Sequence, residues 1–276
     1  MKLSLKRLTS AALLAAGLTS GAHAGSIFLT GHDVDFHNGQ NGFDVVILNY
    51  LRDTTAAASY KVGLIRSIDA INGASGGVGG VLAGSWAGGV TEADPTQFAD
   101  AAAFATFLAT VDVLVVASHT SCGGCDLSTG DSTALNAFAP QIASFFNAGG
   151  DIFGNSGGSL STYYNFLPPT AAASGTSISG STGFTCTAAG VAIGIDCDAA
   201  GTSNINGFPT HNRFTSFASA FTVFETRLGE TISIGLRDAT IVDGGIVPGV
   251  PEPGSLALVG LGALGLAWSR RRSAVR

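Results

Sequence analysis

Basic residues are scarce in this chain of 276 residues. It has 13 Lys and Arg against 19 Asp and Glu, and the segment from Gly25 to Val250 keeps six basic residues against 18 acidic ones, a formal net charge of −12. Proteins that bind nucleic acid use Lys and Arg to neutralise phosphate groups, so this balance argues against a nucleic-acid partner. An acidic surface rich in small residues instead favours solubility.

Long hydrophobic runs are absent as well, and the two shorter ones lie near the ends. Leu8 to Leu18 follows a basic segment and precedes the small-x-small sequence Ala22-His23-Ala24. This order is typical of a secretory signal peptide rather than of a buried first helix, and the run is too short for a stable membrane span. We therefore predict that residues 1–24 are a signal peptide and that the secreted chain begins at Gly25.

The second apolar run, Leu256 to Trp268, carries no charged residue over its 13 positions. At about 1.5 Å per residue it covers about 20 Å of a hydrocarbon core about 30 Å thick, which predicts a marginal transmembrane helix and a transient membrane association. Arg270, Arg271 and Arg272 follow it and would keep that end cytoplasmic, leaving the body on the outer face of the inner membrane.

Residues 250–276 resemble the PEP-CTERM sorting signal, the mark of exosortase substrates in Gram-negative bacteria that make extracellular polysaccharide. The resemblance rests on Pro251, Glu252 and Pro253, on the glycine-rich apolar run and on the arginine cluster. It implies that general export machinery moves the chain and that exosortase cuts near the PEP motif. The body then reaches the cell surface or the medium. A permanent tail anchor is the alternative.

All four cysteines lie in the exported body, where disulfides are permitted. Their short spacings favour two local bridges among three pairings, Cys122 with Cys125 and Cys186 with Cys197. A redox-active pair is the alternative for the first two, but a glycine-rich loop surrounds them instead of the helix start that thioredoxin-type motifs use. The spacing from Cys125 to Cys186 fits no zinc-binding pattern.

Strand and helix patterns alternate from Ser26 to Gly158, which predicts an α/β domain with a flavodoxin-like parallel sheet and helices on both faces. Pro140 should kink or split the third helix, and Gly149 should end it. We expect strands at 26–30, 61–65, 111–117 and 151–154, and helices near 43–51, 98–108 and 132–147.

The remaining body residues differ in composition. Residues 168–207 are mostly Ala, Ser, Thr and Gly without a helical stripe, which predicts an irregular or β-rich insertion held by the second disulfide. Closing strands are expected at 220–226 and 231–236, so that the α/β domain spans 25–237. Residues 238–249 are predicted to be a linker.

Gly154-Asn155-Ser156-Gly157-Gly158 fits the G-x-S-x-G nucleophile elbow and follows a predicted strand, as that motif must. A structural loop is the alternative, because chance matches are common in a glycine-rich chain. The order of elements over 26–225, with the stretch 148–154, also resembles the class I glutamine amidotransferase-like fold, including its ThuA-like relatives. That resemblance places Ser156 where the catalytic members have cysteine. Arg213 stands where they have a glutamate after the histidine, here His211, which argues against amidotransferase activity.

The densest polar cluster, Gly31 to His37, follows the first strand directly. Sites in open α/β sheets form at the carboxyl ends of strands, where we expect His32, Asp33, His119 and Ser156 to meet. His32, Asp33 and His37, with His119, could bind a divalent metal. Alternatively, the carboxylates cap the loop and the histidines are exposed or hydrogen-bonded.

Two functions follow from these patterns. The first is a non-catalytic protein of the cell envelope or extracellular matrix that binds or displays a partner, with extracellular polysaccharide as a candidate. The second is a hydrolase using Ser156 with His119 or His211 as base, assisted by a metal. The lack of an assigned acid partner for either histidine favours the first.

Overall fold

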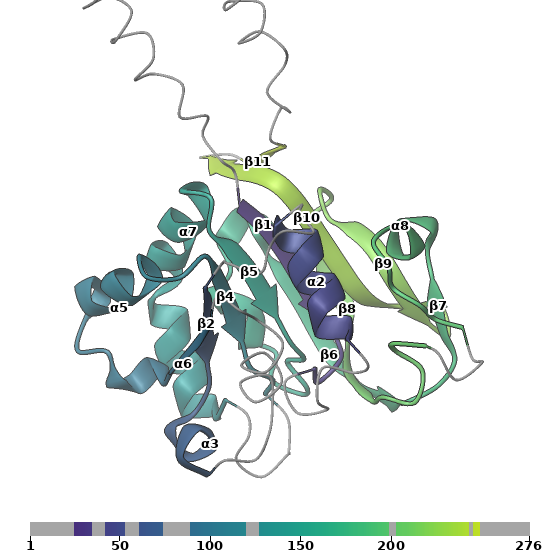
Figure 1. Cartoon of the computed structure of the whole chain (residues 1–276), viewed down its shortest axis with the longest axis horizontal. Helices are drawn as coiled ribbons and strands as arrows, with labels where there is room; N and C mark the ends of the chain where they lie inside the picture. Colours follow the sequence, from purple (N-terminus) through teal and green to yellow (C-terminus); the bar gives the residue numbers. More distant parts are fainter. Residues whose placement is uncertain are drawn as a thin grey trace, which may run out of the picture. The chain divides into compact units, whose positions relative to one another are not determined.

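Five parallel strands form one half of the sheet in the computed structural model of the chain (Figure 1). Their spatial order is β3-β2-β4-β5-β1. The structure describes residues 25–34, 42–52, 61–73, 89–119, 127–198, 203–242 and 245–248. The strands are β1 (Gly25–Thr30), β2 (Val62–Ile65), β3 (Val90–Ala93), β4 (Val113–Val116) and β5 (Asp151–Gly154).

This order explains the flavodoxin-like pattern. A flavodoxin-like sheet has the order 2-1-3-4-5. If β2, β3, β4 and β5 are counted as strands one to four, their spatial order is 2-1-3-4, which matches the first four places. The fifth place, beside β5, is taken by β1, the first strand of the chain. The predicted α/β class is therefore confirmed, with the strand that normally comes last supplied from the beginning of the body.

Helices cover both faces of the parallel strands. On one face, in front in Figure 1, α2 (Phe43–Arg52) packs Phe43 and Tyr50 against Phe28 of β1, with ring centroids 6.3 and 5.7 Å apart. On the other face, Phe146 of α7 (Ala139–Asn147) lies directly against the backbone of Gly25. The further helices are α3 (Ile68–Gly73), α5 (Ala101–Leu108), α6 (Thr129–Ala137) and α8 (Ala188–Ala192).

Side-chain caps fix where the helices begin. Asp100 accepts a hydrogen bond from the N–H of Ala103 at the start of α5, and Ser128 forms a capping box with Asp131 at the start of α6. Pro140 occupies the first turn of α7, where its missing N–H costs nothing. The predicted third helix is therefore split into α6 and α7, as Pro140 indicated.

Antiparallel strands complete the 11-stranded sheet. The long strand β10 pairs with β1 and continues the order through β8 and β6, while β9 also pairs with β10 and carries β7 on its far side. The sheet therefore branches at β10. The strands are β6 (Ala173–Gly180), β7 (Phe184–Cys186), β8 (Thr210–Phe217), β9 (Thr222–Arg227), β10 (Glu230–Val242) and β11 (Gly245–Pro248).

Two stretches are more regular than their sequences suggest. The predicted irregular insertion at 168–207 contains β6, β7 and α8, which favours the β-rich alternative. The predicted linker at 238–249 instead holds the end of β10 and the whole of β11, which pair as antiparallel strands. Asp243 and Gly244 separate these strands in the sequence, and an Asp-Gly pair between apolar runs is a strong hairpin signal.

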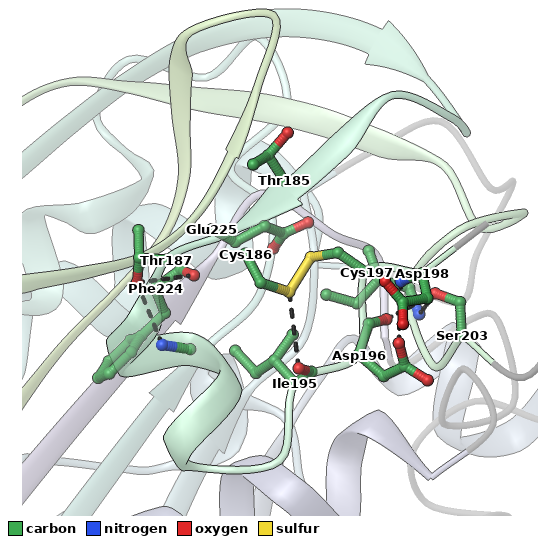
Figure 2. Close-up of a disulfide and its surroundings, with 12 residues drawn as sticks. Thr185, Cys186, Thr187, Ile195, Asp196, Cys197, Asp198, Ser203, Phe224 and Glu225 are labelled. Carbon is green, nitrogen blue, oxygen red and sulfur yellow. Dashed lines mark hydrogen bonds between the residues drawn. A yellow bond between two sulfur atoms is a disulfide. The ribbon is translucent and has the colours of Figure 1, made fainter.

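The predicted Cys186–Cys197 disulfide is present and links β7 to the segment that follows α8 (Figure 2). The two Cα atoms are 5.6 Å apart, within the usual range for a disulfide. Cys122 and Cys125 lie outside the described residues, as do the predicted signal peptide and the sorting tail. Across the residues that are described, no helix combines the length and apolar character needed to cross a bilayer.

Candidate functional site

The carboxyl ends of three parallel strands meet at one rim of the sheet. Beyond β4, the N–H of His119 donates to the carbonyl oxygen of Ser156, which follows β5, over 2.8 Å. The N–H of Ser156 in turn donates to the carbonyl oxygen of His32, beyond β1, over 3.0 Å. These three segments are far apart in the sequence. The parallel pairing of β4 with β5 and of β5 with β1 brings their backbones together.

A cavity of about 500 Å³ opens beside this rim. Two imidazoles line it, His119 from the end of β4 and His211 from β8. The other lining residues are Gly158, Ser159, Ser177, Ile178 and Ser179. The wall therefore offers hydroxyl and imidazole groups that both donate and accept hydrogen bonds.

Asp33 lies behind His211 and is 1% exposed. Its Oδ1 accepts a hydrogen bond from Ser118 Oγ at 2.6 Å, and its Oδ2 is 3.8 Å from His211 Nε2. The backbone N–H of His211 donates to the carbonyl oxygen of Gly31 over 2.8 Å, so that β8 is fixed against the segment that carries Asp33. This contact is within ion-pair range but longer than a hydrogen bond.

Ser156 is fully buried and does not line the cavity. Its Oγ accepts a hydrogen bond from the N–H of Gly158 at 3.1 Å, and within the described residues no hydrogen bond joins it to an imidazole. Gly158 has a positive φ of 53°, and a side chain at Gly157 would touch Tyr163 at 3.0 Å. The glycines of the G-x-S-x-G stretch thus serve a tight turn, as the structural-loop alternative requires.

His32 is also fully buried, and its ring contacts Glu225 of β9. Its Nδ1 is 3.1 Å from the carbonyl oxygen of Pro209 and its Nε2 is 2.8 Å from Glu225 Oε1. A carbonyl oxygen only accepts, so Nδ1 carries a proton and the second nitrogen is held by the carboxyl group of Glu225. In this geometry the ring presents no nitrogen to a metal ion.

The other predicted metal ligands that the structure describes are Asp33 and His119. His37 lies outside the described residues, and Asp33 faces Ser118 and His211. Within the described segments, no group of three or more His, Cys, Asp or Glu residues is placed to hold a metal ion. His119 Nε2 is 3.1 Å from Thr129 Oγ1 at the start of α6. The structure therefore joins His119 and His211 at a cavity and separates both from the ring of His32.

The PEP-CTERM protein-sorting motif matches residues 249–272, the stretch that contains the predicted sorting residues Pro251 to Arg272. No curated protein matches the chain, and no solved structure matches it either. The resemblance of the body to the glutamine amidotransferase-like fold thus gains no support from relatives. The tail motif supports an exported protein that is targeted to exosortase.

Proposed function

We propose that this exported protein binds a hydroxyl-rich ligand, of the kind that extracellular polysaccharide provides, in the cavity beside the strand ends. The observation that carries the proposal is that His119 and His211, supplied by different strands, line one cavity together with Ser159, Ser177 and Ser179. Serine and imidazole groups both donate and accept, as sugar hydroxyls do, so each can pair with such a ligand without burying a charge.

The surroundings of Ser156 favour binding over nucleophilic catalysis. A catalytic serine must present its Oγ to the substrate and to a base, whereas the Oγ of Ser156 is buried and accepts from the N–H of Gly158. A hydrolase is the second candidate because Asp33 provides His211 with the carboxylate partner that sequence reasoning did not assign. The two candidates make different predictions for the same cavity.

The test measures binding of the purified full chain to extracellular polysaccharide from the producing bacterium. Ser177→Trp fills the cavity from β6 and should weaken binding by about tenfold or more, equivalent to at least about 1.4 kcal/mol. Ser174→Trp is the matched control, because Ser174 is an exposed serine of the same strand that does not line the cavity. Equal binding by the two variants would reject the cavity as the binding site.

The same purified chain and polysaccharide also test whether the protein is a hydrolase. Binding without the release of new reducing ends supports the proposal. If the unaltered chain releases new reducing ends and both Ser156→Ala and His211→Ala lose this activity, the hydrolase replaces the binding proposal.

A further inference from the structure

Arg66 lies at the point in the sheet where ligands most often bind in folds of this class. It follows β2 directly, and β2 lies between β3 and β4. The chain leaves β2 for β3 on one side and then returns to β4 on the other, so the carboxyl ends of β2 and β4 form the topological switch point of the parallel half. This position is separate from the residues that line the cavity of His119 and His211.

The guanidinium group of Arg66 is buried and only partly paired. Its side chain is 5% exposed, and Nη1 lies 3.4 Å from Glu92 Oε1, near the outer limit for a hydrogen bond. Nε and Nη2 are buried, and neither donates to an acceptor in the part of the chain that the structure describes. Buried donors in native proteins are almost always paired, so these two call for an acceptor.

The two unpaired donors lie along one edge of the guanidinium plane. The N–H of Nε and the nearer N–H of Nη2 point in the same direction, as a fixed fork. Carboxylate, phosphate and sulfate groups each present two oxygens at the matching separation, and such bidentate pairs are among the strongest hydrogen-bonded contacts in proteins. The chemistry of the free edge thus specifies an oxyanion.

The neighbouring carboxylates among the described residues do not occupy this edge. Asp94 Oδ2 accepts from the N–H of Ile68 and its Oδ1 from the N–H and hydroxyl of Thr96, so both oxygens are used to cap the segments after β2 and β3. Glu92 contacts Nη1 alone. Arg52 shows the contrast, since its Nη1 donates to Asp151 at 3.1 Å and its side chain is 26% exposed.

We propose that Arg66 anchors an oxyanion site at the switch point, where its Nε and Nη2 bind one carboxylate, phosphate or sulfate group. The anion supplies the acceptors that the buried Nε and Nη2 lack. A free ion and an acidic substituent on a larger ligand share this chemistry. The proposal is independent of the polysaccharide cavity, because Arg66 is not one of its lining residues.

The test is the melting temperature of the purified full chain, titrated with phosphate, sulfate, acetate or glucuronate at constant ionic strength, with chloride as the reference. Binding to the folded state alone should give a saturable rise in Tm of roughly 5 °C or more. Stabilisation by glucuronate or acetate alone identifies a carboxylate ligand, and stabilisation by phosphate or sulfate alone identifies a tetrahedral oxyanion. No saturable rise with any of the four overturns the proposal.

Two variants of Arg66 and one control complete the experiment. Arg66→Met removes the charge and should abolish the rise, and Arg66→Lys keeps the charge without the fork and should reduce it at least about twofold. Arg52→Met, which removes a paired arginine from α2, should retain the full rise. A rise in Arg66→Lys equal to that of the unaltered chain would exclude bidentate binding, even if Arg66→Met does not fold.

Discussion

Asp44 carries a buried carboxyl group in the first turn of α2. Burial raises its pKa from 3.8 to about 6, although the N–H groups of Val45 and Asp44 favour the charged form. The folded state therefore binds the proton more tightly than the unfolded state does. The stabilising contribution of this proton is fully present below pH 3.8 and is lost as the pH rises through about 6.

Asp44→Asn should consequently stabilise the protein at pH 8, by up to about 3 kcal/mol in the free energy of unfolding. The variant should also lose the decline in stability between about pH 4 and pH 6 that burial of the carboxyl group predicts. Urea denaturation across this pH range measures both effects. Asp69→Asn is the control, since Asp69 is an exposed aspartate in the first turn of α3. A similar change in both variants would mean that net charge, not burial of Asp44, causes the effect.

Some residues of the candidate site could be placed from the sequence, whereas the contacts of others depend on tertiary packing. His119 and Ser156 each follow a fully buried parallel strand, so the rule for parallel sheets placed their backbones at one rim. The contact between Asp33 and His211 has no such signal, because it depends on how β8 packs against the segment after β1. The pairing of His32 with Glu225 is hidden for the same reason.

At the scale of elements, His32 ties together the strands at the branch of the sheet. Its partner Glu225 lies on β9, and Glu225 Oε2 accepts a hydrogen bond from Ser233 of β10 at 2.6 Å. Ser233 Oγ is also 2.9 Å from Thr30 Oγ1 at the end of β1. Residues of β1, β9 and β10 therefore belong to one buried hydrogen-bond network, in which each polar side chain has a partner.

Glu225→Gln should break this chain and cost about 3–5 kcal/mol of stability, because it leaves a buried partner unpaired. Adding His32→Gln should cost less than the sum of the two single changes, since both residues belong to one pair. Denaturant unfolding of the two single variants and the double variant gives the free energies for this double-mutant cycle. Glu230→Gln is the control, because Glu230 pairs with Arg213 on the same sheet but is solvent-exposed, and its loss should cost less than about 1 kcal/mol. Additive costs in the cycle would disprove the coupling.

The elements themselves were predictable where burial is complete. β1, β2, β4 and β5 are buried along their whole length, and each falls within or beside the range expected for it. β3 was missed because Val90–Ala93 is a partly exposed edge strand with a threonine and a glutamate at its centre. β11 was missed because residues 238–249 were predicted to be a linker, whereas Gly245–Pro248 pairs with β10.

On the scale of the whole molecule, body and tail have opposite charge. The body has a formal net charge of −12, whereas Arg270, Arg271, Arg272 and Arg276 follow the last apolar run. The matched sorting motif spans residues 249–272 and so includes the three adjacent arginines. Clustered Lys and Arg next to an apolar segment hold that end on the cytoplasmic side. We therefore expect the tail charge to determine which side of the membrane presents the PEP motif.

Replacing Arg270, Arg271 and Arg272 with serine should accordingly impair orientation and leave uncut precursor in the cell. Arg276→Ser is the matched control, because it removes an arginine outside the matched motif and should leave processing unchanged. Mass spectrometry of the intact chain distinguishes precursor from a product cut near Pro251. A strain without exosortase should accumulate the same precursor even with the arginines present, which separates failed orientation from failed cleavage. Normal processing of the triple variant would show that these arginines do not orient the tail.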